Sequence, residues 1–467
     1  MLLRVLKAGV FLVLILAAMV APRVVLAQAE VSLPALRGLA PFSVLPNTAA
    51  GQAALASNYT VPGAIQDGTA GQAALQSFAL QRDQALEDAF ITSGNAAELA
   101  DGLGTQLGTQ YQMAALYTSG DDGATSSFTS VSPEVAALFA YTAGVTGADS
   151  AAAKFFFANA TVVSHGDAGP LSKDGASILS TAGGVTDVYG RAYHRPAGSK
   201  GADPYGDSRP FQTETSFAAF GGLDYFGLLS SNDDYLEGPV QALVESPSFP
   251  SGHTTYGFTE ALLLALFVPQ RYPQMIVRGA EYGNSRVVMG AHYAMDVIGG
   301  RTLAYYDVAH LLAQDPAYGE GQARGALGAA GYRAAVNAAR GDVAKALLAS
   351  CGSSIAQCAK SDGGRFSDAV KDAMFYESTQ TYGLAAVYDA TARKPEDVAA
   401  VAPEAGYLLS AAFPGMTLAQ ADEMLTRTEG PGGGFLDDGS AFGLYSRLDL
   451  YKAGLMAQSF LGSVHGG

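Results

Sequence analysis

Helix signals recur along the whole chain, whereas alternating apolar and polar residues, the pattern of strands, are scarce. Residues 132–141 begin with Ser-Pro, which is typical of a helix with serine as N-cap and proline in its first turn. Apolar residues recur at helical spacing over 79–91, and 329–350 is rich in alanine, a strong helix former. Residues 417–420 (TLAQ) match a capping box. The chain is therefore predicted to be all-α.

The first 27 residues are typical of a secretory signal peptide. A basic start precedes an apolar run over 9–20 and a small-residue cleavage pattern at 25–27, so Gln28 is the expected mature N-terminus. A membrane anchor is disfavoured because the run is short and Pro22 and Arg23 follow it. No later segment reaches about 18 unbroken apolar residues. We expect an exported protein, periplasmic or secreted, with no integral membrane segment after cleavage.

The chain has two cysteines, Cys351 and Cys358, whose spacing would close a small loop. In an oxidising compartment we expect them to form a disulfide, and two free buried cysteines are the alternative. A metal site would need further ligands nearby, and none are evident in the sequence. No bound metal is therefore expected.

The formal net charge is −16, and the sequence pI is near 4.7. This balance argues against a nucleic-acid binder, which would present a basic surface. An anion site in this chain must instead be a local pocket of Arg, Lys and His side chains.

Composition and motif positions suggest four parts. They are a signal peptide (1–27), an N-terminal helical region (28–150), a catalytic core with all the chemical motifs (151–312) and a C-terminal helical extension (313–467).

The most informative segment contains His292 and Asp296. The sequence looks helical from Ala291 onward, which would place the two side chains on one helix face. A carboxylate bonded to one imidazole nitrogen leaves the lone pair of the other nitrogen free to attack. Arg286, just before this predicted helix, has the planar guanidinium that suits phosphate oxygens.

A second segment, PSGH, places Ser251, Gly252 and His253 immediately before a predicted helix. N–H groups at a helix start bind anions, and glycine permits close approach of the backbone to a ligand. His253 could protonate a leaving alcohol oxygen. A third segment, DPYGDSRPF, supplies Arg209 as another guanidinium. Two histidines, two arginines and a helix start around one tetrahedral anion suit phosphoryl transfer.

These motifs resemble motifs two and three of the type 2 phosphatidic acid phosphatase superfamily: PSGH at 250–253, and Ser285-Arg286-x5-His292-x3-Asp296. The following DVIGGR at 296–301 resembles the family as well. This superfamily includes bacterial non-specific acid phosphatases, lipid phosphate phosphatases and vanadium haloperoxidases. The resemblance covers roughly the central third of the chain and implies a helical-bundle core with the site among its helices.

The resemblance also implies the roles of the residues. His292 would be the nucleophile, oriented by Asp296, and His253 would be the general acid and later the base for water. Phosphate would be held by Arg209, Arg286 and the backbone of Ser251 and Gly252.

Motif one departs from the family pattern, in which a lysine precedes Arg-Pro by seven positions. That position before Arg209 is Ala202. Lys200 and Arg191 are therefore the candidates for the third phosphate-binding cation.

The predicted function is an exported acid phosphatase that needs no metal or other cofactor and acts on small phosphate monoesters through a phosphohistidine. One alternative is a vanadium haloperoxidase with vanadate as cofactor, against which the absence of tryptophan weighs slightly. Others are a lipid phosphate or pyrophosphate phosphatase and a non-catalytic anion-binding surface protein. The physiological substrate and the oligomeric state do not follow from the sequence.

Overall fold

The computed structural model describes residues 33–70, 73–89, 95–115, 117–118, 127–128, 130–158, 187–214, 217–315, 328–352, 354–362, 364–393 and 395–465. The predicted signal peptide lies outside the described residues. Within them the chain is mostly helical, and the strands are two short antiparallel pairs, β1 (Tyr117–Thr118) with β2 (Ser127–Phe128) and β3 (Gly221–Leu223) with β4 (Leu229–Ser231). The prediction of an all-α protein is confirmed.

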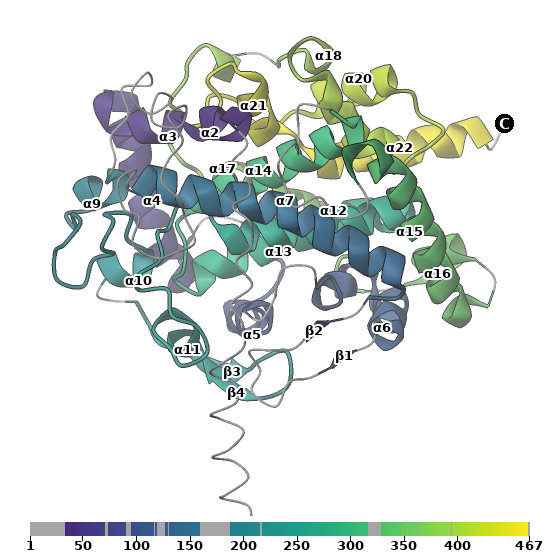
Figure 1. Ribbon diagram of the computed structural model, residues 1–467, viewed down its shortest axis with the longest axis horizontal. Coiled ribbons are helices and arrows are strands. Elements are labelled where there is room, and N and C mark those ends of the chain that lie inside the picture. The colour runs from purple at the N-terminus through teal and green to yellow at the C-terminus, as the bar shows by residue number, and fades with distance from the viewer. Residues whose placement is uncertain are drawn as a thin grey trace, which may run out of the picture.

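Three consecutive helices form the centre of the molecule: α12 (Gly252–Phe267), α13 (Tyr272–Val288) and α14 (Ala294–Ala313). They are buried on nearly every side. This is expected of α12 and α14, which are mostly apolar, whereas α13 also buries charged and polar side chains such as Arg278 and Glu281. Two long helices, α7 (Pro133–Ala158) and α15 (Gly328–Cys351), pack against this centre (Figure 1).

The elements before the centre surround it from several sides (Figure 1). They are α2 (Leu33–Leu39), α3 (Pro41–Val44), η1 (Leu45–Asn47), α4 (Ala49–Gln66), α5 (Phe78–Asp88), η2 (Glu98–Leu103), α6 (Thr105–Ala114), α9 (Val188–Ala192), α10 (Pro210–Thr213) and α11 (Asn232–Leu236). Of these, α5, η2 and α4 contact α13 directly.

Most of the remaining elements lie along the opposite edge from α5 and α6 in Figure 1, whereas α16 lies beside α6. They are the short helix η3 (Pro269–Arg271), α16 (Ile355–Ser361), α17 (Ala369–Thr381), η4 (Thr391–Arg393), α18 (Val398–Val401), η5 (Pro403–Gly406), α19 (Tyr407–Ser410), α20 (Leu418–Thr428), α21 (Ala441–Leu444), η6 (Tyr445–Arg447) and α22 (Leu450–His465). No helix among the described residues is long and apolar enough to cross a bilayer.

Two helix N-caps predicted from the sequence, at Ser132 and Thr417, are present in the structure. Ser132 Oγ accepts a hydrogen bond from Val135 N (3.2 Å) at the start of α7. Thr417 Oγ1 accepts from Gln420 N (3.3 Å) at the start of α20, and Gln420 Oε1 accepts in return from Thr417 N (2.9 Å). However, α7 extends to Ala158, well beyond residue 141, and it crosses the predicted boundary between 150 and 151.

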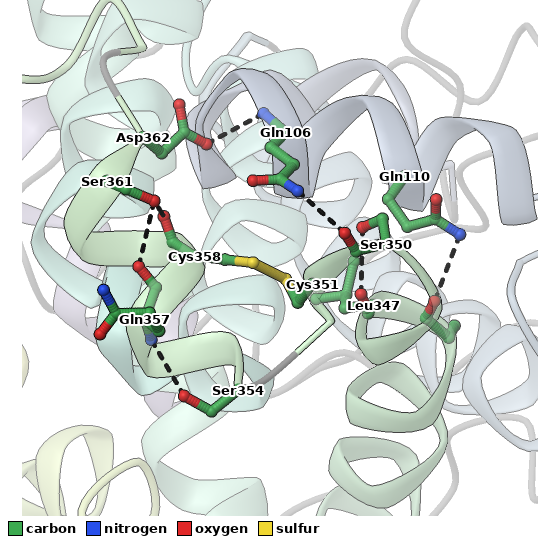
Figure 2. The surroundings of a disulfide bond; sticks show 11 residues. Gln106, Gln110, Leu347, Ser350, Cys351, Ser354, Gln357, Cys358, Ser361 and Asp362 are labelled. Atoms are coloured by element: carbon green, nitrogen blue, oxygen red, sulfur yellow. Dashed lines mark hydrogen bonds between the residues drawn. A yellow bond between two sulfur atoms is a disulfide. The ribbon is translucent and has the colours of Figure 1, made fainter.

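The predicted disulfide between Cys351 and Cys358 is present and joins the end of α15 to α16 (Figure 2). Nearby, the Asp362 carboxylate accepts hydrogen bonds from the backbone N–H groups of Thr105 (2.8 Å) and Gln106 (3.0 Å). These are the first residues of α6. The C-terminal extension therefore caps a helix of the N-terminal region.

A second connection between distant parts of the chain is a buried charge network on α13. Arg278 donates to Asp88 (2.6 Å) and to Asp101 (2.8 Å), which belong to the N-terminal region. Arg365, from the C-terminal extension, donates to Asp101 and to Glu281 of α13, each at 2.6 Å. N-terminal, central and C-terminal segments thus share one network.

Candidate active site

The loop between α13 and α14 carries His292, and α14 supplies Asp296. The predicted helix start at Ala291 is wrong, because α14 begins at Ala294 and His292 precedes it. Asp296 is the third residue of the helix, and its Oδ2 accepts from the backbone N–H of Tyr293 (2.8 Å), which makes Tyr293 the N-cap. The same Oδ2 lies 3.2 Å from His292 Nδ1, so the expected His–Asp pair forms in this different backbone setting.

The tautomer of His292 follows from its two neighbours. Arg209 Nη1 lies 3.0 Å from His292 Nε2, and an arginine can only donate a hydrogen bond. Nε2 must therefore accept, which places the proton of the neutral ring on Nδ1, facing Asp296. Burial, followed by the positive charge of Arg209, holds the pKa of His292 well below its usual range. The resting ring is neutral, with its lone pair on Nε2.

Arg209 is held by the protein on every side. Its Nε donates to Ser246 O (2.8 Å), and Nη1 also donates to Ala291 O (2.8 Å). Its Nη2 donates to Ser246 Oγ (3.1 Å) and to Pro247 O (3.0 Å). Together with the bond to His292, these contacts occupy all of its N–H donors. In this arrangement Arg209 orients the imidazole, a role that the sequence did not predict.

Asp296 is fully buried and surrounded by donors. Tyr189 donates its hydroxyl to Oδ1 (2.6 Å), and Ser248 Oγ donates to Oδ2 (2.5 Å). Burial raises the pKa of Asp296 to about 6, although these hydrogen bonds act to lower it. Neither Tyr189 nor Ser248 was singled out from the sequence.

The PSGH segment forms the start of α12 rather than preceding it. Ser251 is the N-cap and accepts from Thr254 N (3.2 Å), whereas Gly252 and His253 are already helical. The Ser251 N–H donates to the Asp296 carbonyl oxygen (3.1 Å) and is therefore occupied. The N–H groups of Gly252 and His253 are the ones that the helix start directs outward.

His253 is partly exposed, in contrast to His292, which is 1% exposed. Burial of the ring lowers the pKa of His253 well below its usual range, and the positive charges of Arg286, Lys154 and Arg209 lower it further. These three residues are the cations that surround the two histidines. His253 is therefore neutral until negative charge enters the site.

Arg286 belongs to the last turn of α13, not to a loop before the next helix. It is 3% exposed, its Nη2 donates to Ala85 O (3.4 Å), and its guanidinium carbon lies 4.9 Å from the centre of the Tyr282 ring. Its Nε has no hydrogen-bond partner among the described residues. Arg286 thus retains a donor for an anion.

The third cation of the site is Lys154, which the sequence did not predict. Lys200 and Arg191 are both exposed, and neither is among the cations that act on His253. Lys154 comes from α7, and its charge acts on both His253 and His292. Burial, then the charge of Arg209, lowers the pKa of Lys154 to about 7.

The end of α7 also touches α12. Ser150, one turn before Lys154, has its Oγ 3.5 Å from the position that a Cβ on Gly252 would occupy. Lys154 is thus held beside the helix start that carries His253. No sequence signal identifies it, because the residues between α7 and Arg209 separate it from the other motifs.

Glu98 of η2 is a further residue that the sequence missed. It is 3% exposed, and neither carboxyl oxygen has a hydrogen-bond partner among the described residues. Burial and the charge of Asp88 raise the pKa of Glu98 well above its usual range, opposed by Arg278 and Arg286. Glu98 is thus a neutral carboxyl near the Arg286 charge.

The described residues contain no cluster of three or more His, Cys, Asp or Glu side chains able to hold a metal ion. The positive charge of the site comes from Arg209, Arg286, Lys154 and the start of α12. Such a cluster beside a neutral imidazole lone pair can bind a tetrahedral oxyanion and attack its central atom.

The sequence model of the PAP2 superfamily matches residues 185–317. This segment contains Arg209, His253, Arg286, His292 and Asp296, whereas Lys154 lies outside it. No solved structure matches the chain.

Three curated relatives match parts of the chain. An acid phosphatase of Zymomonas mobilis subsp. mobilis is 41% identical over 71 residues, which are 15% of this chain and 27% of the relative. A non-specific acid phosphatase of Salmonella typhimurium is 44% identical over 69 residues, 15% of this chain and 28% of the relative. One of Providencia stuartii is 28% identical over 141 residues, 28% of this chain and 55% of the relative. The matches therefore span from about a quarter to about half of these relatives.

Proposed function

We propose that this chain, whose residues 185–317 match the sequence model of the PAP2 superfamily, is a phosphatase that hydrolyses phosphate monoesters through a phosphohistidine on His292. The observation that carries the proposal is the neutral His292 ring, which Asp296 contacts at Nδ1 and Arg209 contacts at Nε2, so that the lone pair is on Nε2. The names of the relatives support a phosphatase, and an alcohol phosphate is the substrate class whose charge this site complements.

In the first step Nε2 attacks phosphorus, and the bond from phosphorus to the ester oxygen breaks. The leaving oxygen takes a proton from His253. Arg286, Lys154 and the N–H groups at the start of α12 stabilise the charge that spreads over the equatorial oxygens. Arg209 must share its Nη1 donor between the imidazole and the phosphoryl group during this step.

In the second step water attacks the phosphohistidine. His253, now neutral, accepts a proton from the water, and the bond between phosphorus and Nε2 breaks. His292 regains its lone pair, and inorganic phosphate leaves with the water oxygen. The proton on His253 then leaves with inorganic phosphate or to solvent, and the bare site returns to its starting protonation state.

The proton on His253 arrives with the substrate. The bare site holds His253 neutral, but a bound phosphate brings negative charge that offsets Arg286, Lys154 and Arg209. The monoanionic ester, which prevails below its second pKa of about 6, also carries a proton of its own. Since Asp296 must stay ionised, we propose a mildly acidic optimum that falls away on both sides.

The proposed chemistry uses side-chain cations throughout, so we expect it to proceed without a metal. We also propose that the protein is exported and that its partners are small phosphate esters rather than nucleic acid. The net charge of −16 disfavours long polyanions at the surface while leaving this local pocket available.

The test is hydrolysis of p-nitrophenyl phosphate by the full chain with EDTA present, comparing the wild type with His292→Ala. We expect EDTA-resistant activity in the wild type, inhibition by vanadate, and a loss of at least about a thousandfold in the variant. Acid quenching should trap phosphate on the wild type and not on the variant.

Wild-type protein without activity towards phosphate monoesters would overturn the proposal. Loading with vanadate and measuring halide oxidation would then test the haloperoxidase alternative. Activity that survives His292→Ala would show that another nucleophile is used.

A further inference from the structure

The Tyr189 hydroxyl is the sole donor to Asp296 Oδ1 among the described residues, at 2.6 Å. The other oxygen, Oδ2, faces Ser248 Oγ, Tyr293 N and His292 Nδ1. Tyr189 belongs to α9, outside the motifs that the sequence singled out. We propose that Tyr189 is a positioning residue, whose hydroxyl keeps Asp296 ionised and thereby holds His292 as the attacking tautomer; this rests on the proposed function.

The ring of Tyr189 is fixed by aromatic neighbours. Tyr193 stacks on it at 5.1 Å between ring centres with 20° between the planes, and Tyr293 lies at 4.9 Å. Phe42 of α3 meets it edge-on at 5.2 Å. Burial and the charge of Asp296 raise the pKa of Tyr189 well above its usual range, so its hydroxyl stays protonated and donates.

The tautomer depends on this bond because the two ring nitrogens have different partners. Ionised Asp296 accepts from Nδ1–H, which leaves Nε2 to accept from Arg209. Protonated Asp296 would instead donate a hydrogen bond to Nδ1 and would favour the tautomer with hydrogen on Nε2. That hydrogen would then face the N–H donor of Arg209. The nucleophilic lone pair would then be lost.

Several charged or titratable groups lie around Asp296 besides Tyr189. They are Arg209 and Asp207 from the segment before α10, Lys154 of α7, Tyr193 of α9, and Tyr293 and His292 next to α14. The two cations favour the ionised carboxylate, whereas a negative charge on Asp207 opposes it. Burial raises the pKa of Asp207 well above its usual range, and the charge of Asp296 adds to this rise. Hydrogen bonds are therefore the main force that keeps a buried Asp296 ionised.

The experiment is the pH dependence of kcat/KM for p-nitrophenyl phosphate in wild type, Tyr189→Phe and Tyr193→Phe, from about pH 4.5 to about pH 9. Losing one hydrogen bond to a charged group should raise the pKa of Asp296, so the acid limb of Tyr189→Phe should move up by about one pH unit. The rate should fall about tenfold near pH 5 and return to the wild-type value above about pH 7.5. Ser248→Ala should move the limb in the same direction.

Tyr193→Phe is the matched control. The Tyr193 ring packs against Tyr189, but its hydroxyl accepts from Asn58 Nδ2 (2.8 Å) and donates to Leu55 O (3.0 Å). The pH profile of Tyr193→Phe should superimpose on that of the wild type. A loss in Tyr189→Phe that is equal at every pH, or an acid limb that does not move, would overturn the inference.

A second measurement separates this inference from the proposed function. Long-range 1H–15N correlation spectra of the His292 ring, assigned with His292→Ala, should show hydrogen on Nδ1 in the wild type. As the pH is lowered, Tyr189→Phe should lose the hydrogen on Nδ1 at a higher pH than the wild type does. An inactive wild type with this tautomer shift would overturn the phosphatase proposal alone, whereas an active wild type without the shift would overturn the role of Tyr189.

Discussion

Lys154 gives the site a cation whose charge depends on pH. Its pKa of about 7 in the bare site reflects burial and the nearby charge of Arg209, partly offset by Asp296. A bound phosphate would stabilise the ammonium form, so binding should carry a proton onto Lys154 above about pH 7. Under the proposed function, we therefore expect Lys154 to link phosphate affinity to pH on the basic side of the profile.

Replacing Lys154 with methionine keeps the length of the side chain and removes its charge. We expect kcat/KM to fall about 10- to 100-fold at pH 6, mainly through KM, because a charge-assisted phosphate contact is lost. Steady-state kinetics and competition by inorganic phosphate would measure this. Lys200→Ala and Arg191→Ala are the matched controls and should stay within about twofold. A loss of activity in Lys200→Ala or Arg191→Ala, with none in Lys154→Met, would instead support the sequence-based prediction that Lys200 or Arg191 is the third cation.

At the scale of elements, α12 and α14 approach each other closely at Gly300. A Cβ at this position would lie 2.6 Å from Ser251 O and 3.2 Å from Thr255 N, which are backbone atoms and cannot swing aside. This close contact holds α14, which carries Asp296, next to the start of α12, which carries His253. The GG in the DVIGGR segment is thus explained by helix packing.

Gly300→Ala should lower the free energy of unfolding by about 1–2 kcal/mol, because overpacking of about 1–3 kcal/mol exceeds the helix gain of about 0.5–1 kcal/mol. Under the proposed function, kcat should fall as well, since α12 with His253 and α14 with Asp296 are pushed apart. Gly341→Ala, at an exposed position of α15 with nothing within 4 Å of the new Cβ, should instead gain about 0.5–1 kcal/mol. Urea unfolding and kinetics on both variants test this. Equal stabilities would contradict the packing argument.

At the scale of the whole molecule, a region outside the matched segment holds the end of α13, which carries Arg286. Ser285 donates to Asp88 Oδ2 (2.6 Å), immediately before Arg286 in sequence, and Arg278 donates to the same carboxylate. Burial would raise the pKa of Asp88, but Arg278 and Ser285 together lower it below its unfolded value. Its stabilising contribution is therefore present above that value and is lost as the pH falls through the folded-state pKa.

Asp88→Ala should cost about 3–5 kcal/mol in the free energy of unfolding, because it leaves Arg278 buried with one partner fewer. The double variant Asp88→Ala with Arg278→Ala should cost less than the sum of the single changes. The exposed pair Glu423 and Arg427 (3.8 Å) is the control, and Glu423→Ala should stay within about 0.5 kcal/mol. Additive costs in urea unfolding would refute the coupling of the pair.

What the sequence determined by itself is local. The four-residue spacing of His292 and Asp296 survives although the helix begins later than predicted, because the loop backbone and the capping carboxylate act over a few residues. The helix that follows Ser251 and the disulfide are likewise short-range features. The disulfide was predicted correctly, whereas the helix begins at Gly252, inside the segment that was predicted to precede it.

The tertiary structure decided which distant side chains complete the site. Tyr189 meets Asp296 across 107 residues of chain, and Lys154 reaches the histidines from a helix that the motif pattern did not include. Arg191 and Lys200 had the right charge and neighbourhood in sequence, but they point to solvent. Residue type and spacing encode local geometry, whereas the partners of a buried side chain depend on how whole helices pack, which no short pattern records.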